Sequence, residues 1–228
     1  MISDKIVCII LARGGSKAIP NKNITRFCGA PLIAHSIKQA SESKYITDVY
    51  VSSDSDTILE TSEHYGAKLL KRPDWLSTDS STSESALRHF LLNVDCDVVV
   101  FAQATSPLRH SSDFDNAIIK YCEGNYDSMF SACEAQDFFV WQEREEKLSS
   151  ITYDHHSRSL RQHIRGLLLE NGSFYIFKKK GFLTNNNRLF GNIGYYLMDS
   201  WKRYEIDEPD DLEICAALYN KRMKKWKD

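Results

Sequence analysis

The fold is decided by residues 5–23, which read KIVCIIL followed by ARGGSKAIPNKN. Residues 6–11 form a continuous apolar run, as expected of a strand that is covered on both faces. Similar runs at residues 97–102 and 128–133 alternate with helical patterns along the chain. This alternation predicts an α/β fold with a Rossmann-like, open, mostly parallel sheet flanked by helices.

Individual residues set the expected boundaries of these elements. Pro31 opens a helix, because proline at the first helical position loses no hydrogen bond. Asp54 or Asp56 is expected to cap the helix that Gly66 ends, and Pro209 starts a closing helix. The sequence predicts strands at residues 6–11, 47–52, 67–70, 97–102, 128–133, 173–177 and 195–198, and helices ending near residues 40, 64, 92, 122 and 225.

Composition places the chain among ordinary single-domain globular proteins. Its 228 residues carry 29 Lys and Arg against 31 Asp and Glu, a formal charge of −2, which lacks the basic excess typical of nucleic-acid binders. No apolar stretch approaches the ~18 residues that a membrane span needs. We therefore expect one domain over residues 1–228, no nucleic-acid partner and no membrane segment. Residues 136–165 form an irregular insertion, with a hairpin tip at residues 144–147.

The N-terminus and the cysteines indicate a cytoplasmic protein. Residues 1–5 lead straight into the first strand, without the long apolar region and small-residue cleavage site of a secretory signal. The six cysteines are dispersed and form no Cys-x-x-Cys pair. This pattern predicts reduced cysteines that pack as apolar side chains, rather than a zinc site or a disulfide framework.

The loop after the first strand has the composition of a phosphate-binding site. Two adjacent glycines let backbone N–H groups converge on an anion, and Arg13, Lys17 and Lys22 add positive charge around them. The loop contains neither the Gly-x-Gly-x-x-Gly fingerprint nor a Walker sequence. A flexible surface turn is the alternative. The position at the carboxyl end of a strand, where open α/β sheets bind ligands, favours phosphate binding.

Residues 12–23 resemble the signature of the cytidylyltransferases that activate sialic acid and related nine-carbon keto-sugar acids, the CMP-acylneuraminate synthetase family. The resemblance implies a nucleotidyltransferase-type fold and transfer of CMP from CTP to the anomeric hydroxyl of a nonulosonic acid, with release of pyrophosphate. Further segments resemble the family's motifs in the same order: VSSD (51–54), KRP (71–73) with Asp79, QATSPLR (103–109), RQ (161–162), NGSFYI (171–176) and EIDEPDDL (205–212).

The resemblance also implies which residues contact the triphosphate. Arg13 and Lys22 match the family's triphosphate contacts, and they would stabilise the charge that develops on the leaving pyrophosphate. With Asp207 they are the predicted catalytic residues. Ser16 and Asn23 either donate hydrogen bonds to the nucleotide or cap the turn. The predicted nucleotide-binding set is Leu11, Ala12, Arg13, Gly14, Ser16, Asn23, Arg72 and Ser83.

Cytosine recognition is assigned by the resemblance to Arg72 and Ser83. The guanidinium of Arg72 can donate, as a planar fork, to the O2 and N3 acceptors of the base. The alternative is that Arg72 pairs on the surface with nearby Asp74 or Asp79, because this loop is acidic.

The acceptor sugar is expected at the same edge of the sheet, because Gln103 and its neighbours directly follow a buried strand. In the family the matching Gln contacts the sugar, and Arg161 matches an element directed at the sugar's carboxylate, which suits a bidentate contact. Tyr175 either closes the sugar pocket or packs in the core, and Arg109 pairs with a carboxylate, most simply at a helix edge. The predicted sugar-binding set is Gln103, Thr105, Ser106, Arg161 and Tyr175.

Asp207 is the predicted ligand of Mg²⁺, the expected cofactor, because a strongly negative triphosphate and a hydroxyl of high pKa both call for a carboxylate-bound divalent cation. The family often presents two Asp flanking one residue, whereas the first position here is Glu205. Asp210 and Asp211 are expected to cap the closing helix. A second departure, LLLE at residues 167–170, leaves the identity of the sugar open.

The insertion resembles the family's dimerisation element. Its aromatic residues Phe138, Phe139 and Trp141 would be hard to bury in a monomer, so we expect a homodimer. Two other functions stay open: a sugar-1-phosphate nucleotidyltransferase, and a catalytically silent CTP-binding regulator, which Glu205 in place of Asp would support.

Overall fold

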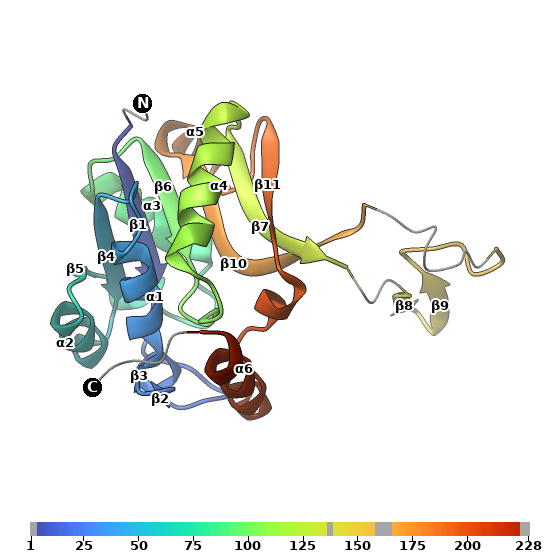
Figure 1. Cartoon of the computed structure of the whole chain (residues 1–228), viewed down its shortest axis with the longest axis horizontal. Helices are drawn as coiled ribbons and strands as arrows, with labels where there is room; N and C mark the ends of the chain where they lie inside the picture. Colours follow the sequence, from blue (N-terminus) through green and yellow to red (C-terminus); the bar gives the residue numbers. More distant parts are fainter. Residues whose placement is uncertain (1–3, 136–138, 158–165, 224–228) are drawn as a thin grey trace.

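The computed structural model describes residues 4–135, 139–157 and 166–223, and at its centre these residues form a seven-stranded sheet (Figure 1). The strands, in spatial order, are β11 (Ile193–Met198), β7 (Ser128–Glu134), β10 (Leu168–Lys178), β6 (Val98–Ala102), β1 (Ile6–Leu11), β4 (Asp48–Ser53) and β5 (Lys68–Lys71). All neighbouring pairs are parallel except those that involve β10, which runs antiparallel to β6 and β7. The predicted mostly parallel, open sheet is therefore confirmed.

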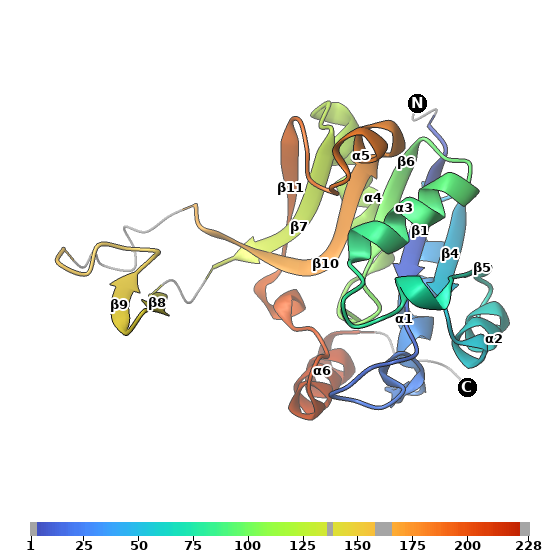
Figure 2. The ribbon, with the colours of Figure 1, turned by 180° about the vertical axis from the view of Figure 1, so that it is seen from behind.

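Helices cover both faces of the sheet (Figures 1 and 2). On one face, Ile33 and Phe114 pack in a cluster with Cys8 of β1. On the other face, Phe90 packs with Val7 of the same strand. No helix among the described residues is long and apolar enough to cross a bilayer. The first face carries α1 (Leu32–Ser41), α2 (Asp56–His64) and α4 (Ser111–Glu123), and the second carries α3 (Ser83–Asn93) and α5 (Lys179–Asn185).

A third apolar cluster joins the C-terminal helix α6 (Pro209–Arg222) to the N-terminal loop. Phe27, Ile206 and Tyr219 pack in it. Phe27 lies in the two-stranded pair β2 (Arg26–Phe27) and β3 (Ala30–Pro31), which follows the short 3₁₀ helix η1 (Lys22–Ile24). This cluster holds the segment before α6 against the loop that follows β1.

Several predicted boundaries are wrong in detail. Ser55, not Asp54 or Asp56, caps α2, because its hydroxyl accepts from the backbone N–H of Ile58. β10 begins at Leu168 rather than at residue 173, and α5 has no counterpart in the prediction. Asp211 behaves as expected, since its carboxylate accepts from the backbone N–H of Glu208 at 2.8 Å. Two further 3₁₀ helices are η2 (Asp74–Leu76) and η4 (Ser200–Arg203).

The insertion between β7 and β10 contains a β-hairpin, β8 (Trp141–Arg144) with β9 (Lys147–Ser150). The predicted tip is confirmed: Glu145 and Glu146 turn the chain with positive φ angles of 49° and 62°, the pattern of a two-residue hairpin turn. The hairpin lies apart from the sheet (Figure 1). Phe138 is outside the described residues.

Candidate active site

The carboxyl ends of β1, β4 and β6 meet at one edge of the sheet, which we call the site edge. The loop of residues 12–23 follows β1, and Gln103 follows β6. The backbone N–H of Ile206 donates to the C=O of Thr105 at 2.8 Å. This bond brings residues 205–207 to the same edge, although they are about a hundred positions further along the chain.

The cations of the loop are each held by a carboxylate. Lys22 Nζ lies 2.8 Å from Oδ1 of Asp207. Arg13 and Lys17 both contact Asp79, at 3.0 and 2.7 Å. The hydrogen bond from Lys17, followed by that from Arg13, lowers the pKa of Asp79. The three cations that the sequence predicts to bind phosphate are thus paired with carboxylates, which are negatively charged like a phosphate.

The loop backbone is organised by side chains. The N–H of Gly14 donates to Oδ1 of Asp54 at 3.1 Å, and the N–H of Ser16 donates to the C=O of Gly14. Asn23 is buried, and its amide donates to the C=O of Arg13 at 3.0 Å. Of the two alternatives for Asn23, the structure therefore shows the turn-organising one. The Gly14 N–H, which we expected to face an anion, is bonded to a carboxylate.

A cavity of about 250 Å³ opens beside this loop. Arg72 lines it and is only 4% exposed. Its Nε and one terminal nitrogen have no hydrogen-bond partner among the described residues, and that nitrogen lies 3.8 Å from Asp54. Burial lowers the pKa of Arg72. Surface pairing of Arg72 with Asp74 or Asp79 is therefore wrong. The wall also includes Leu11, Arg13, Ser83, Phe101 and Gln103.

Other predicted sugar residues are more enclosed. Ser106 is buried, and its hydroxyl has no partner within the described part of the chain. Tyr175 is 6% exposed and stacks on Phe101, while its hydroxyl donates to Glu170. Tyr175 is thus a core residue with an occupied hydroxyl, the second of its two alternatives. Arg161 lies outside the described residues.

Two acidic residues, Glu205 and Asp207, lie at the site edge beyond Gln103. Glu205 accepts from the hydroxyl of Thr105 at 3.2 Å. Burial, and then the charge of Asp207, raise the pKa of Glu205 to about 7. No cluster of three or more His, Cys, Asp or Glu side chains suited to a metal occurs in the described ranges. One or two carboxylates with substrate phosphates is the donor set that Mg²⁺ usually takes, so these residues fit that ion.

Comparison with known proteins gives the family. Residues 7–225 match the family model described as cytidylyltransferase. The chain belongs to the cytidylyltransferase family. N-acylneuraminate cytidylyltransferase A of Danio rerio is 36% identical over 94% of the chain, and the chain spans 50% of that relative's length. Post-translational flagellin modification protein B of Campylobacter coli is 31% identical over 98% of the chain and 99% of its own length.

A solved structure supports the fold that the family match implies for this chain. It is that of CMP:2-keto-3-deoxy-manno-octonic acid synthetase complexed with CTP, with a TM-score of 0.76. The likeness covers 96% of this chain and 100% of that chain at 17% sequence identity. The nucleotidyltransferase-type fold is therefore confirmed.

Sequence reasoning missed the role of Asp54. Its carboxylate lies between the Gly14 N–H and the guanidinium of Arg72, and so joins the loop of residues 12–23 to the cavity that Arg72 lines. The signal was present, because Asp54 ends the VSSD segment at the carboxyl end of a predicted strand. Arg109 was also misjudged: it is fully buried and bonds to carbonyl and hydroxyl oxygens rather than forming a helix-edge ion pair.

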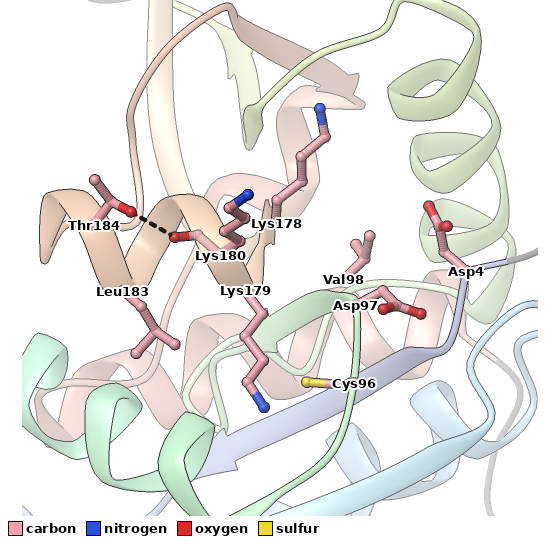
Figure 3. A pocket seen from close by; sticks show the side chains of 9 residues that line it. All are labelled: Asp4, Cys96, Asp97, Val98, Lys178, Lys179, Lys180, Leu183 and Thr184. Atoms are coloured by element: carbon pink, nitrogen blue, oxygen red, sulfur yellow. Dashed lines mark hydrogen bonds between the residues drawn. The ribbon is translucent and has the colours of Figure 1, made fainter.

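A larger cavity, of about 560 Å³, opens at the opposite edge of the sheet (Figure 3). Its charged side chains are largely bonded to the protein itself. Lys178 pairs with Asp127 at 3.0 Å, Lys179 Nζ donates to the C=O of Val94, and Asp97 accepts from the backbone of Lys5. This cavity lies at the other end of the strands from Arg13 and Asp207, so it is not where the predicted site residues gather.

Proposed function

We propose that the protein transfers CMP from CTP to the anomeric hydroxyl of a nonulosonic, sialic-type acid and releases pyrophosphate. The observation that carries the proposal is that the buried Arg72 lines the same cavity as Arg13, while two of its guanidinium nitrogens have no hydrogen-bond partner among the described residues. A donor for a base and a cation for phosphates then lie in one space. The relative named N-acylneuraminate cytidylyltransferase A supports the choice of acceptor.

Cytosine fits the donors of the cavity. Its O2 and N3 atoms both accept hydrogen bonds, and the fork of Arg72 presents N–H groups in one plane. Uracil carries a proton on N3, so it would place a donor against a donor, which a buried site tolerates poorly. Ser83, at the first turn of α3, provides a further polar group in the wall.

In the proposed reaction the anomeric oxygen bonds to the α-phosphorus of CTP and the α-phosphorus–oxygen bond to the β-phosphate breaks. The hydroxyl loses its proton and pyrophosphate leaves with the displaced charge. Arg13 and Lys22 stabilise that charge. Before CTP binds, Asp79 and Asp207 hold these cations, so phosphate oxygens replace carboxylate oxygens at both of them.

Asp207 and Glu205 are the residues that would hold Mg²⁺. When bound, this ion would neutralise triphosphate charge and lower the pKa of the attacking hydroxyl. Thr105 orients Glu205 through its hydrogen bond. Lys22, whose side chain is 15% exposed, holds Asp207 at the site edge until the phosphates take its place.

We assign the acceptor sugar to the space beside Gln103. Arg161 would pair with its carboxylate in a bidentate contact, and Thr105 and Ser106 would supply hydroxyl groups. Tyr175 supplies no free hydroxyl to the sugar, because it packs in the core and its hydroxyl is bonded to Glu170.

Pyrophosphate release tests the proposal. The protein is incubated with CTP and Mg²⁺ and with N-acetylneuraminic, legionaminic, pseudaminic or deaminated acids, or with sugar 1-phosphates. We expect turnover only with an acid sugar. Turnover only with sugar phosphates would establish a sugar-1-phosphate nucleotidyltransferase. Tight CTP binding by calorimetry with no turnover on any acceptor would establish a silent regulator.

A homodimer is part of the proposal. On one face of the outer strand β11, Ile193, Tyr195 and Leu197 are each more than 40% exposed. A hollow of about 420 Å³, lined by Tyr195 and Leu197 and by Leu168 at the start of β10, continues this apolar surface. Trp141 in the insertion is also 44% exposed. Apolar area of this kind favours a protein partner, and a second copy supplies the same surfaces. We place the dimer in the cytoplasm, where its free cysteines stay reduced.

A further inference from the structure

Arg109 is the largest fully buried side chain that carries a charge. It follows the QATSP segment after β6, and its guanidinium reaches back beneath the site edge. Its terminal nitrogens donate to the C=O of Gln103 at 2.9 Å and to the C=O of Ser173 at 3.0 Å. They also donate to the hydroxyls of Ser173 and Ser36. Its Nε has no partner among the described residues.

The bonding of Arg109 is unusual because every partner is neutral. No carboxylate among the described residues lies within ion-pair distance of it, and burial lowers its pKa to about 10. A buried charge is normally paired with an opposite charge, because its desolvation is otherwise poorly compensated. An apolar side chain would fill this volume at lower cost. What an apolar side chain could not provide is the set of hydrogen bonds from the guanidinium to the carbonyls of Gln103 and Ser173.

The two carbonyls that Arg109 joins belong to both strands that border the candidate acceptor site. Gln103 follows β6, and Ser173 lies in β10, where the ladder with β7 shifts register between Glu170 and Tyr175. The N–H of Gln103 donates to the same Ser173 carbonyl at 3.0 Å. Arg109 thus fixes the backbone of the two strands relative to each other, beyond the last Phe174–Ala102 pair of their ladder.

Each of these strands presents one group to the acceptor side. Gln103 lines the cavity with its own side chain. Gly172, next to Ser173, lies against Glu205 so closely that a Cβ atom there would overlap Oε1 of that carboxylate. A shift of either backbone would therefore move an acceptor-side group directly. Asn171 supports the same bulge, because its Oδ1 accepts from the N–H of Ser173 and from Ser131.

We propose that Arg109 is a positioning residue for the acceptor, acting through the backbones of Gln103 and Ser173. It touches neither substrate nor the reacting atoms. The inference rests on the proposed function, since it takes the Gln103 side as the place of the acid sugar. It predicts an asymmetry: the acceptor half of the site depends on Arg109, whereas the base cavity around Arg72 does not contact it.

The first test is kinetic. Arg109→Lys keeps a charge but loses the fork that spans the two carbonyls. We expect the KM for the acid sugar to rise about tenfold and kcat to fall at least as much, with the KM for CTP within about twofold, because misplacement of reacting groups is costly in rate. Ser36→Ala, which removes one bond to Arg109, is expected to shift the same constants in the same direction, by less. The Ser36→Ala variant provides the kinetic test if Arg109→Lys does not fold.

Phe182→Leu is the matched control for simple destabilisation. Phe182 is fully buried in α5, in the cluster on the second face of the sheet. The Phe182→Leu substitution should lower the melting temperature without altering the site edge, and we expect the KM values of this variant for both substrates to equal those of the wild type. An Arg109→Lys protein that melts earlier but keeps wild-type kinetics for both substrates would overturn the proposal.

The second test does not depend on turnover. Hydrogen exchange should show that the amides of Gln103 and of residues 172–174 exchange at least about tenfold faster in Arg109→Lys than in the wild type, while those of α5 do not change. Unaltered exchange at these amides would overturn the positioning role. A wild type that releases no pyrophosphate with acid sugars would instead refute the proposed function. The exchange result would still decide what Arg109 does.

Discussion

Carboxylates pair with the three cations of the loop at residues 12–23. Asp79 holds Arg13 and Lys17, and Asp207 holds Lys22. In the proposed reaction a triphosphate displaces these partners, so part of its attraction is spent on separating existing pairs. The pairs at Asp79 are exposed, and water and salt screen such pairs, so each contributes little. Their effect should therefore be modest and sensitive to salt.

Asp79→Asn tests this competition. Removing the negative charge frees Arg13 and Lys17, and we expect the Kd for CTP to fall about two- to fivefold at low ionic strength, with a smaller change at high salt. Calorimetry at two salt concentrations measures it. Asp95→Asn is the control, because Asp95 forms an exposed pair with Lys5 away from the site. Weaker CTP binding by Asp79→Asn would show that the carboxylate helps the nucleotide rather than competing with it.

Arg72→Lys tests base recognition. A lysine keeps one charge but cannot present two coplanar donors. We expect the preference for CTP over UTP to shrink by about 1–3 kcal/mol, because a matched buried hydrogen bond is lost. Competitive turnover with both nucleotides measures it. Arg88→Lys, on the exposed side of α3, should leave the preference unchanged. An unaltered preference in Arg72→Lys would move cytosine recognition elsewhere.

At the scale of an element, the bulge in β10 places backbone rather than side chains at the site. Gly172 has a φ of +63°, which favours glycine, and a side chain there would meet Glu205. Gly66 has a similar φ of +88°, but nothing lies within 4 Å of the place a Cβ would take. The two glycines therefore separate backbone strain from steric conflict.

Gly172→Ala and Gly66→Ala form a matched pair. Both should lose about 1 kcal/mol of unfolding free energy, because alanine is strained at positive φ. Only Gly172→Ala must also displace the Glu205 carboxylate, so we expect only this variant to lose turnover, by about tenfold or more. Urea unfolding and pyrophosphate release measure the two effects. Equal turnover in the two variants would mean that the Glu205 position is unimportant.

His35 connects three elements and should make their stability depend on pH. It lies in α1 and is 2% exposed, Nε2 donates to the C=O of Phe27 at 2.8 Å, and Nδ1 accepts from the hydroxyl of Tyr219 in α6. Both ring nitrogens are thus satisfied by the neutral tautomer. Burial lowers its pKa from 6.5 to about 4.

The sign follows from proton uptake. Between pH 6.5 and 4 the unfolded chain binds a proton at His35 that the folded chain does not, so unfolding free energy falls as pH drops through this window. The contribution is about 3 kcal/mol, complete above pH 6.5 and lost by pH 4. Denaturant unfolding at several pH values gives the unfolding free energy as a function of pH. Between pH 6.5 and 4 this free energy should fall less steeply in His35→Leu than in the wild type. Equal slopes in the two proteins would mean that His35 is not held neutral.

For the whole molecule, the apolar surfaces on β11 and the insertion predict the assembly. We expect a homodimer by light scattering after size exclusion. The double variant Ile193→Lys with Leu197→Lys places two charges on that surface and should give a monomer that keeps its circular dichroism. Exchanging exposed Leu92 for Lys is the control, since Leu92 lies in α3. A wild-type monomer at micromolar concentration would contradict the expectation.

Much of the fold could be predicted from local patterns in the sequence. The opening strand and the loop at residues 12–23 were predictable because burial on both faces and a glycine pair leave strong local signals. Asp54 and Arg109 were not, because their roles depend on distant partners: Gly14 is 40 positions from Asp54, and Ser173 is 64 positions from Arg109. Tyr175 was undecided for a different reason: its hydroxyl partner, Glu170, is only five positions away, but the two residues flank a register shift in β10 that strand alternation does not predict.

The reversed direction of β10 makes the insertion separable from the catalytic core. Glu134 at the end of β7 pairs directly with Leu168 at the start of β10, and Ala135 donates to Leu167 just beyond. The chain therefore leaves and re-enters the sheet at neighbouring points, as in an ordinary hairpin. Each doubling of the length of such an excursion adds only ~0.6 kcal/mol of closure entropy. An ancestor could have lengthened, replaced or shed this excursion without disturbing the register of any other strand.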